Sequence, residues 1–218
     1  MEQLNHLAST IALTLGVGWA SGINLYAAVL TLGVLQSTGY VQLPPDLQVV
    51  ADPLVMGAAA LMYCVEFFAD KTPGVDTGWD ALHTFVRLPA GAALAAAAVG
   101  DMSPAVQIAA ALVGGGLAAG SHAVKSGGRV LINTSPEPFS NWTASLAEDL
   151  AVIMGLWAAL NHPVVFLILL ALFIALSAWL LPRLWRGIRR VATAIGRFFG
   201  GSGHSTRAAS LPPADRDD

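Results

Sequence analysis

The sequence predicts an all-α fold, a polytopic membrane bundle of about six transmembrane helices in a chain of 218 residues. Three observations predict it. Apolar residues make up 55% of the chain and charged residues only 11%, whereas about a quarter of the residues in soluble domains are charged. Six apolar stretches are each long enough to cross a hydrocarbon core of about 30 Å as a helix. Lys and Arg occur in only every second connection between these stretches.

The expected spans follow one another with short connections. They are residues 7–36, 52–70, 78–99, 104–126, 140–160 and 163–181. Connections 37–51, 100–103 and 161–162 lack Lys and Arg, whereas those after the second and fourth spans contain Lys71 and Arg129. By the positive-inside rule, this alternation predicts a multi-pass protein of the cell inner (plasma) membrane with cytoplasmic N- and C-termini. A soluble bundle is the alternative, but six such helices would leave almost no solvent-facing surface.

Three regions are expected along the chain. Residues 1–182 form the transmembrane bundle, and Pro182 is expected to break the last span. Residues 183–199 interleave Arg with Trp, Ile and Phe, which predicts a basic amphipathic helix in the membrane interface, an anchor or a lipid sensor. Residues 200–218 are rich in Gly, Ser, Pro and Asp and are expected to be disordered. Because the basic residues gather beside the membrane, membrane lipids are the expected partners and nucleic acid is not.

A weak internal repeat relates the first span to the fourth. Residues 18–24 and 116–122 each contain two glycines four positions apart, followed by Asn24 or His122. Three spans separate the copies, so they would cross the membrane in opposite directions, as in the three-plus-three inverted repeats of transporters. Gly22 and Asn24 would then mark a helix break. The same glycine pattern also packs membrane helices and can join two copies of a chain into a homo-oligomer.

Polar side chains recur at helical spacing inside four of the spans. Asp80, His83 and Arg87 share one helix face, because residues i, i+3 and i+7 point the same way. The residues at 122, 125 and 129 repeat this spacing. The residues expected to bind a transported ligand are Asn24, Glu66, Asp70, Asp80, His83, Arg87, His122, Lys125, Glu148 and Asp149.

A charge deep in a bilayer costs several kcal/mol unless it finds a partner or water, so these groups are expected to form one hydrated cluster. The expected pairs are Arg87 with Glu66 or Glu148, and Lys125 with Asp149 or Asp80. Acids outnumber bases here, so some carboxyl groups are expected to be protonated or to await a cation. The alternative is a closed ion-pair network that fixes helix register and transports nothing.

Two segments beside this cluster predict irregular backbone that dips toward the membrane. They are residues 126–129, which contain two glycines, and residues 133–138, Asn-Thr-Ser-Pro-Glu-Pro. Irregular backbone at that depth needs protein or water around it. Together with Lys125 and Arg129 it would cradle a phosphate or carboxylate, which makes an anionic lipid head group one candidate ligand.

Several motifs carry a resemblance to a known family. They are Ser-Gly-Ile-Asn-Leu-Tyr at 21–26, Val-Glu-Phe-Phe-Ala-Asp-Lys at 65–71, Pro-Gly-Val-Asp at 73–76, Trp-Asp-Ala-Leu-His-Thr-Phe-Val-Arg at 79–87, and the segment at 133–138. Over roughly residues 15–160 the chain resembles a bacterial family of small integral-membrane proteins catalogued only as a domain of unknown function. The resemblance implies a multi-span membrane fold and supplies no activity, substrate or catalytic residue.

The residues predict an integral membrane protein with a cytoplasm-facing polar cavity. We expect a secondary transporter or permeation pathway for a small solute, an ion or an anionic lipid; a scaffold or assembly factor with structural buried charges is the alternative. An enzyme is not expected, since the sequence has neither a Gly-x-Ser-x-Gly nor a His-Glu-x-x-His motif. His83 and His122 could form a metal site with Asp80 and Glu148, but such His residues more often hydrogen-bond, so no metal or cofactor is expected.

Overall fold

The structure is a computed structural model that describes residues 2–72, 74–133 and 138–200. Within these ranges every regular element is a helix, as predicted. The elements are α1 (Glu2–Ser37), the short 3-10 helix η1 (Pro45–Ala51), α2 (Pro53–Ala69), α3 (Val75–Ala98), α4 (Pro104–Ile132), α5 (Pro138–Asn161) and α6 (Pro163–Gly200). Proline begins four of the α-helices, which suits a first turn whose N–H groups have no partner within the helix.

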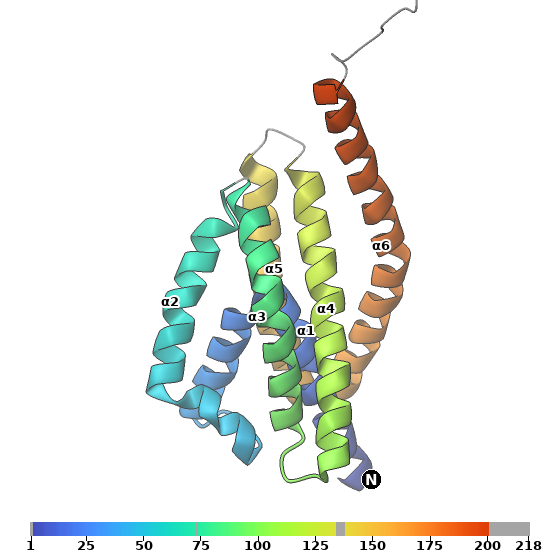
Figure 1. The fold of residues 1–218 in the computed structure, drawn as a ribbon. Coiled ribbons are helices and arrows are strands. Elements are labelled where there is room, and N and C mark those ends of the chain that lie inside the picture. Colours follow the sequence, from blue (N-terminus) through green and yellow to red (C-terminus); the bar gives the residue numbers. More distant parts are fainter. Residues whose placement is uncertain (1, 73, 134–137, 201–218) are drawn as a thin grey trace, which may run out of the picture.

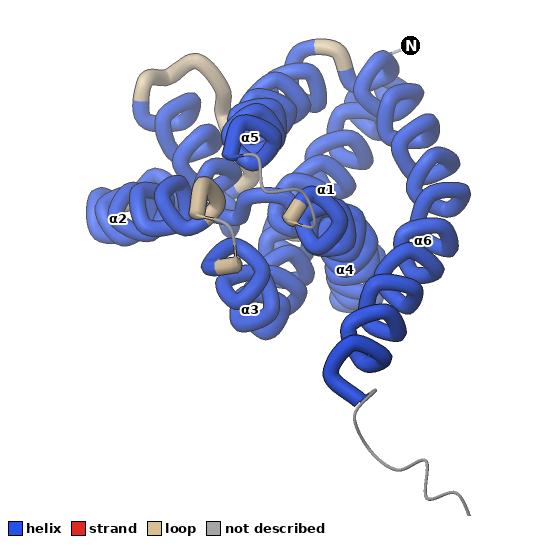
Figure 2. The backbone as a smooth tube through the Cα atoms, turned by 90° about the horizontal axis from the view of Figure 1, so that it is seen from above, coloured by secondary structure: helices blue, strands red, loops and turns tan. Residues whose placement is uncertain are grey.

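The length and composition of the helices agree with a multi-pass membrane protein. Five helices are long and apolar enough to cross a membrane, and a sixth span results if η1 and α2, which meet at 59°, count as one. Figure 2 shows α2 and α6 on opposite sides of the bundle, with α1 between them. In the most apolar window of α1, 72% of the residues are buried, against 17–28% in the other four helices. The first helix is therefore the centre of the fold, and the others present apolar surface outward.

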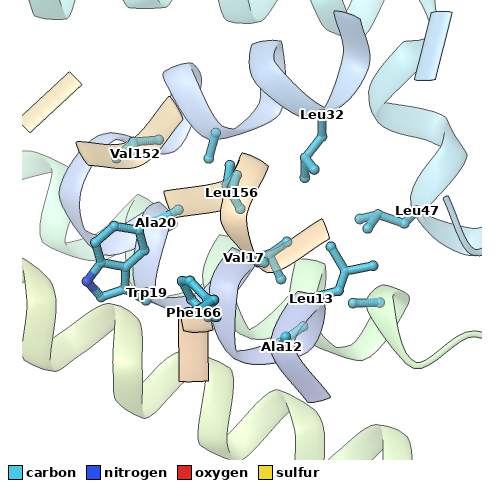
Figure 3. Packing of buried hydrophobic residues seen from close by; sticks show 14 of the residues in the cluster. Ala12, Leu13, Val17, Trp19, Ala20, Leu32, Leu47, Val152, Leu156 and Phe166 are labelled. Atoms are coloured by element: carbon cyan, nitrogen blue, oxygen red, sulfur yellow. The ribbon is translucent and has the colours of Figure 1, made fainter. Parts of the chain in front are cut away.

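The core forms where α1 meets α5 and α6. Figure 3 shows Val17 and Trp19 of α1 beside Leu156 and Phe166. The ring of Trp19 meets those of Phe166 and Phe173 edge to face, with ring centroids 6.1 and 6.0 Å apart. Such aromatic pairs stabilise a core beyond the area that they bury.

The helix α1 is broken at Asn24, as predicted. This residue has φ −146° and ψ 98°, outside the helical region. Its side-chain Oδ1 accepts a hydrogen bond of 3.0 Å from the backbone N–H of Ala27, which is the geometry of an N-terminal helix cap. We call residues 2–23 the first arm, residues 25–37 the second arm, and Asn24 the apex.

From the apex, the two arms of α1 extend to the same end of the bundle, the end that contains the N-terminus (Figure 1). The first arm follows α4 in parallel, since Leu7 lies near Val106 and the Ile23 carbonyl accepts a hydrogen bond from Lys125. The second arm runs back, from the level of Asp149, which the apex contacts, to the start of α2, where Gly33 lies against Met56. The helix is therefore a re-entrant hairpin whose apex lies inside the protein.

The two ends of the bundle differ in charge. The acidic end contains the start of α1, η1 and the α3–α4 connection, with Glu2, Asp46, Asp52 and Asp101 and no Lys or Arg in the described residues. The basic end contains the α2–α3 connection, the end of α4 and the C-terminal part of α6, with Lys71 and the Arg residues of α6.

The two termini lie at opposite ends of the bundle, which bears on the expectation that both are cytoplasmic. Figure 1 places the start of α1 at the acidic end and the end of α6 at the basic end. A long apolar stretch looks the same in sequence whether it crosses once or folds back, which is why the sequence did not reveal the hairpin. The positive-inside rule is met equally well, because no Lys or Arg precedes Lys71.

Four further expectations are corrected or limited by the structure. The helix α6 continues through Pro182 to Gly200 instead of breaking there. Membrane helices tolerate a proline where nearby carbonyl groups find other donors, and here Arg183 Nη1 donates to the Trp179 carbonyl in the turn before the proline. Residues 126–129 are helical, since α4 extends to Ile132. The irregular backbone expected at 133–138 and the disordered tail expected at 200–218 fall mainly on residues 134–137 and 201–218, which lie outside the described residues.

The two copies of the internal repeat differ in how closely their glycines pack against other helices. A Cβ at Gly22 would collide with Ser121 and the Ala118 carbonyl, so the first arm packs closely on α4 there. A Cβ at Gly116 or Gly120 would meet no atom within 4 Å among the described residues. Because α4 also remains helical at His122, the apex of α1 has no counterpart in the fourth span.

The topology is testable in a bacterial inner membrane. In a Cys64→Ala background, which removes the single native cysteine, Asn5→Cys should react with a membrane-impermeant maleimide in intact spheroplasts. Thr193→Cys should react only after the membrane is permeabilised, because the basic end is retained inside. Labelling of both positions only after permeabilisation would contradict the hairpin.

The close approach of α1 to α4 gives a stability prediction. Gly22→Ala should lower the free energy of unfolding in detergent by about 1–3 kcal/mol, because the new methyl group has no room beside Ser121. Gly120→Ala is the matched control and should cost nothing, since its methyl group would enter open space. Equal melting temperatures for the two variants would refute this packing.

Candidate functional site

Seven charged side chains from four helical segments converge in the basic half of the bundle. We call them the charge network: the acids Glu66, Asp70, Asp80 and Glu148, and the bases Arg87, Lys125 and Arg129. Six of these side chains are at most 2% exposed, and only Glu148 is partly accessible, at 20%. Glu148 is therefore the most accessible member of the network.

Arg87 holds two acids from inside α3. Its Nη2 lies 2.6 Å from Glu66 Oε1, and its Nη1 lies 3.0 Å from Asp80 Oδ1. The same Nη1 lies 3.0 Å from His122 Nδ1. Because arginine can only donate, Nδ1 is the acceptor and a neutral His122 carries its proton on Nε2, which donates to Thr84 Oγ1 at 2.8 Å. Arg87 thereby sets the tautomer of His122.

Lys125 lies at the centre of the network. Its Nζ donates to Asp70 Oδ2 at 2.8 Å, to Glu66 Oε1 at 3.2 Å and to the Ile23 carbonyl at 3.1 Å. Glu148 Oε2 and Asp80 Oδ1 lie further from Nζ, at 3.6 and 3.9 Å. The ammonium group thus connects all four acids to the end of the first arm of α1.

Arg129 binds Glu148 through two nitrogens. Nη2 lies 2.6 Å from Glu148 Oε2, and Nε donates to Oε1 at 3.3 Å. Nη1 donates to the Asp70 carbonyl at 2.7 Å, which fixes the guanidinium group. Such bidentate pairing is the strongest geometry for an arginine and a carboxylate.

The apex of α1 is tied to the charge network on one side and to the neighbouring Asp149 on the other. The first arm ends in carbonyls that accept from Lys125 and, at Trp19, from Ser121 Oγ at 2.8 Å. A cation is favourable at that negative end of a helix dipole. On the other side, Asn24 Nδ2 donates to Asp149 Oδ1 at 2.8 Å, and Tyr63 donates to Asp149 Oδ2 at 2.9 Å.

The structure decides between the expected ion pairs. Arg87 pairs with Glu66, as one alternative predicted, and Lys125 approaches Asp80 as well as nearer acids. The pairs of Arg87 with Glu148 and of Lys125 with Asp149 do not form: Glu148 binds Arg129, and Asp149 binds Asn24 and Tyr63. Adjacent helical residues point about 100° apart, so Glu148 and Asp149 face different neighbours.

His83 lies outside the charge network. Its ring stacks on Trp79 with ring centroids 4.1 Å apart, and its Nε2 lies 3.1 Å from the Tyr26 hydroxyl. Because His83 contacts Trp79 and Tyr26 while His122 contacts Arg87 and Thr84, these two histidines do not form the metal site with Asp80 and Glu148 that the sequence left open. Among the described residues, no group of three or more His, Cys, Asp or Glu is arranged to hold a metal ion.

Some residues at the site were not predicted. Tyr63 lies one helical turn before Glu66, so its position on the same face was a signal that could have identified it. Lys71, in the connection after α2, is also buried: its Nζ lies 2.9 Å from the centroid of the Phe67 ring and 3.3 Å from Ser145 Oγ. Burial lowers the pKa of this ammonium group, because desolvation disfavours its charged form.

Two pockets flank the network. One of about 320 Å³ lies between α4, α5, α6 and the apex region, and Lys125, Arg129 and Glu148 form its polar wall. The other, of about 360 Å³, reaches Asp80 and His122 beneath Leu184 and Trp185 of α6. Most of their lining is apolar, so the expected polar cavity is instead a compact network bordered by apolar pockets. The backbone cradle expected at 126–129 is absent, because these residues form part of α4.

The coupling inside the network can be measured by unfolding in detergent. Arg87→Met should cost about 3–5 kcal/mol, because it leaves Glu66 and Asp80 buried without their main partner. Adding Glu66→Gln to that variant should cost less than Glu66→Gln alone, since the second change removes an unpaired charge. Strictly additive costs would show that the two groups do not interact.

Comparison with known proteins places the chain in a family. No curated protein and no solved structure matches it. Residues 11–183 match the family described as a domain of unknown function (DUF4126), over most of the chain and including every residue of the charge network. The chain belongs to this family, as its motifs indicated.

Proposed function

We propose that this integral membrane protein is a secondary transporter or permeation pathway, with the charge network and the apex of α1 as its central site. The observation that carries the proposal is the break at Asn24, which brings a main-chain carbonyl into contact with buried charges. Discontinuous helices of this kind bind substrates and ions inside transporters, because their broken ends supply backbone ligands and partial charges. Irregular backbone is tolerated at such depth only inside protein or beside water.

The energetics of the network support a functional role. Each buried charge costs several kcal/mol to desolvate, and replacing buried ion pairs by apolar side chains often stabilises a protein. A bundle that needed only stability would therefore not require seven such groups. Four acids face three bases, and Glu66 Oε2, Asp70 Oδ1 and Asp80 Oδ2 are buried without a hydrogen-bond partner among the described residues. An excess of buried acid of this kind suits coupling to a proton or a cation.

The charge distribution supports an orientation. We place the basic end in the cytoplasm and the acidic end outside, because Lys and Arg are retained on the inner side of the plasma membrane. Lys125 lies seven residues before the end of α4, about 10 Å along the helix. Its site is then closer to the cytoplasmic surface, and Glu148 is its point of access.

A scaffold or assembly factor is the second candidate. The observation in its favour is the completeness of the pairing: every base of the network contacts at least two acids. Such a network fixes the positions of α2 to α5 without any movement. The two candidates differ in what happens when Glu148 loses its charge.

Thermal unfolding of the detergent-purified protein tests the proposal. The wild type would be scanned against cations, organic anions and phospholipids at several pH values. A ligand at 100 times its dissociation constant adds about 2.7 kcal/mol, and the pH dependence of that stabilisation should disappear in Glu148→Gln. That variant should itself melt near the wild type, since its side chain is partly exposed and still accepts from Arg129.

Glu2→Gln is the matched control, because Glu2 is an exposed acid at the acidic end. It should retain both the melting temperature and the ligand effect. An absence of any ligand effect, combined with early melting of Glu148→Gln, would favour the scaffold.

A further inference from the structure

We propose that the substrate is an anionic membrane lipid, whose carboxylate or phosphate head group takes the place of the Glu148 carboxylate on Arg129 and Lys125 while its apolar chain lies between α5 and α6. This inference rests on the proposed transport function and names its substrate class.

The head-group site is already occupied by an anion of the protein itself. Glu148 presents both oxygens to Arg129, and its Oε2 also lies 3.6 Å from Lys125 Nζ. Both bases are buried and held in place, Arg129 by the Asp70 carbonyl and Lys125 by the Ile23 carbonyl. A carboxylate and a phosphate offer an arginine the same paired oxygens, so either can replace Glu148 in this geometry.

Charge counting identifies Glu148 as the replaceable acid. Without it, the network contains three acids, Glu66, Asp70 and Asp80, and three bases, and is neutral. Glu148 is also the one member with an accessible side chain, at 20% against 2% or less for the other six. An incoming anion that displaced it would leave the network with the same total charge.

The pocket beside the network continues into an apolar groove. The pocket of about 320 Å³ that contains Arg129 and a second pocket of about 350 Å³ share Trp19, Ala151 and Phe173. The second pocket follows α5 and α6 toward the acidic end as far as Phe166, and its lining is apolar apart from the indole N–H groups of Trp19 and Trp157. A head group at Arg129 therefore has space for a chain directed into the membrane.

Trp19 provides a further polar contact in this groove. The residue is only 8% exposed, and its indole N–H has no hydrogen-bond partner among the described residues. Buried indole groups usually find an acceptor. Since Trp19 lines both pockets, an ester or phosphate oxygen of the lipid is an available acceptor for this donor.

The exchange balances with one proton. The Glu148 carboxylate leaves Arg129 but stays inside the bundle beside the bound lipid anion, where burial and the like charge favour its taking one proton from the cytoplasmic water. One lipid anion binds Arg129 and Lys125 in its place. Arg87 and Arg129 keep their protons throughout, because arginine does not deprotonate in proteins. The charged groups around Glu148 are Asp70 at the end of α2, Lys71 in the connection that follows, Asp80 and Arg87 on α3, and Lys125 and Arg129 on α4. Glu66 lies beside Lys125, and the neutral His122 lies beside Arg87. Lipid uptake is thereby coupled to proton uptake.

The test measures binding of fluorescent phosphatidylglycerol and phosphatidylcholine to the purified full-length protein between pH 5 and pH 8. Phosphatidylglycerol should bind at least tenfold more tightly, and its dissociation constant should rise by up to about tenfold per pH unit, as one linked proton requires. In Glu148→Gln this pH dependence should vanish while binding persists, an outcome that a purely structural Glu148 would not produce.

A second pair of variants tests the groove. Ala151 is exposed and lines both pockets, so Ala151→Phe should fill the groove and weaken phosphatidylglycerol binding at least tenfold. Leu150→Phe is the matched control, because Leu150 lies on the same helix, is 60% exposed and lines neither pocket. It should bind as the wild type does.

The remaining outcomes separate this inference from the proposed function. If acetate or inorganic phosphate binds as tightly as the lipid and Ala151→Phe has no effect, the ligand is a soluble anion and the inference fails. If only cations stabilise the protein, transport remains but an anionic substrate is excluded. Equal binding of both lipids with no pH dependence would also overturn the inference.

Discussion

The cost of burying charge inside a membrane bundle is the constraint on which the rest of this structure depends. Arg87, Lys125 and Arg129 cannot remain unpartnered in the interior, so α2, α3 and α5 must place acids around them. These contacts set how far each helix is rotated and at which level it meets α4. The wide apolar surface facing outward supplies no such register, because lipid is as apolar as the side chains themselves.

The broken helix α1 meets the same constraint with backbone groups. A helix that stops inside a membrane leaves carbonyls and N–H groups without partners in the helix. Each of these groups costs free energy if it makes no other hydrogen bond. Here Lys125 and Ser121 satisfy carbonyls of the first arm, and Asn24 caps the second arm with its own side chain. The network therefore supports the apex, and the apex supplies Lys125 with an oxygen. Movement of either one changes the partners of the other, which is the property that a transport site requires.

The sequence predicted the composition of this site better than its geometry. The i, i+3, i+7 spacing correctly placed Asp80 and Arg87 on one face, and the Gly22–Asn24 pattern correctly located the break. It could not show that the chain folds back after Asn24, because hydropathy carries no direction. The choice between Glu148 and Asp149 as partner of Arg129 depends on the rotation of α5 about its axis, which is set by neighbours distant in sequence. Pro182 was misleading because membrane helices tolerate a proline where nearby carbonyl groups find other partners, as the Trp179 carbonyl does in Arg183.

The most direct measurement of the central claim is lipid movement across a reconstituted bilayer. Proteoliposomes would contain phosphatidylglycerol or phosphatidylcholine with a fluorescent label, and an impermeant reductant would report the fraction in the outer leaflet over time. A transport site built on a replaceable anion predicts faster exchange of phosphatidylglycerol than in protein-free liposomes and little exchange of phosphatidylcholine. Exchange of phosphatidylglycerol should increase when the side that faces the basic end is acidified. Exchange of phosphatidylglycerol no faster than in protein-free liposomes, by protein that still binds the lipid, would contradict transport and leave the charge network as a fixed structural element.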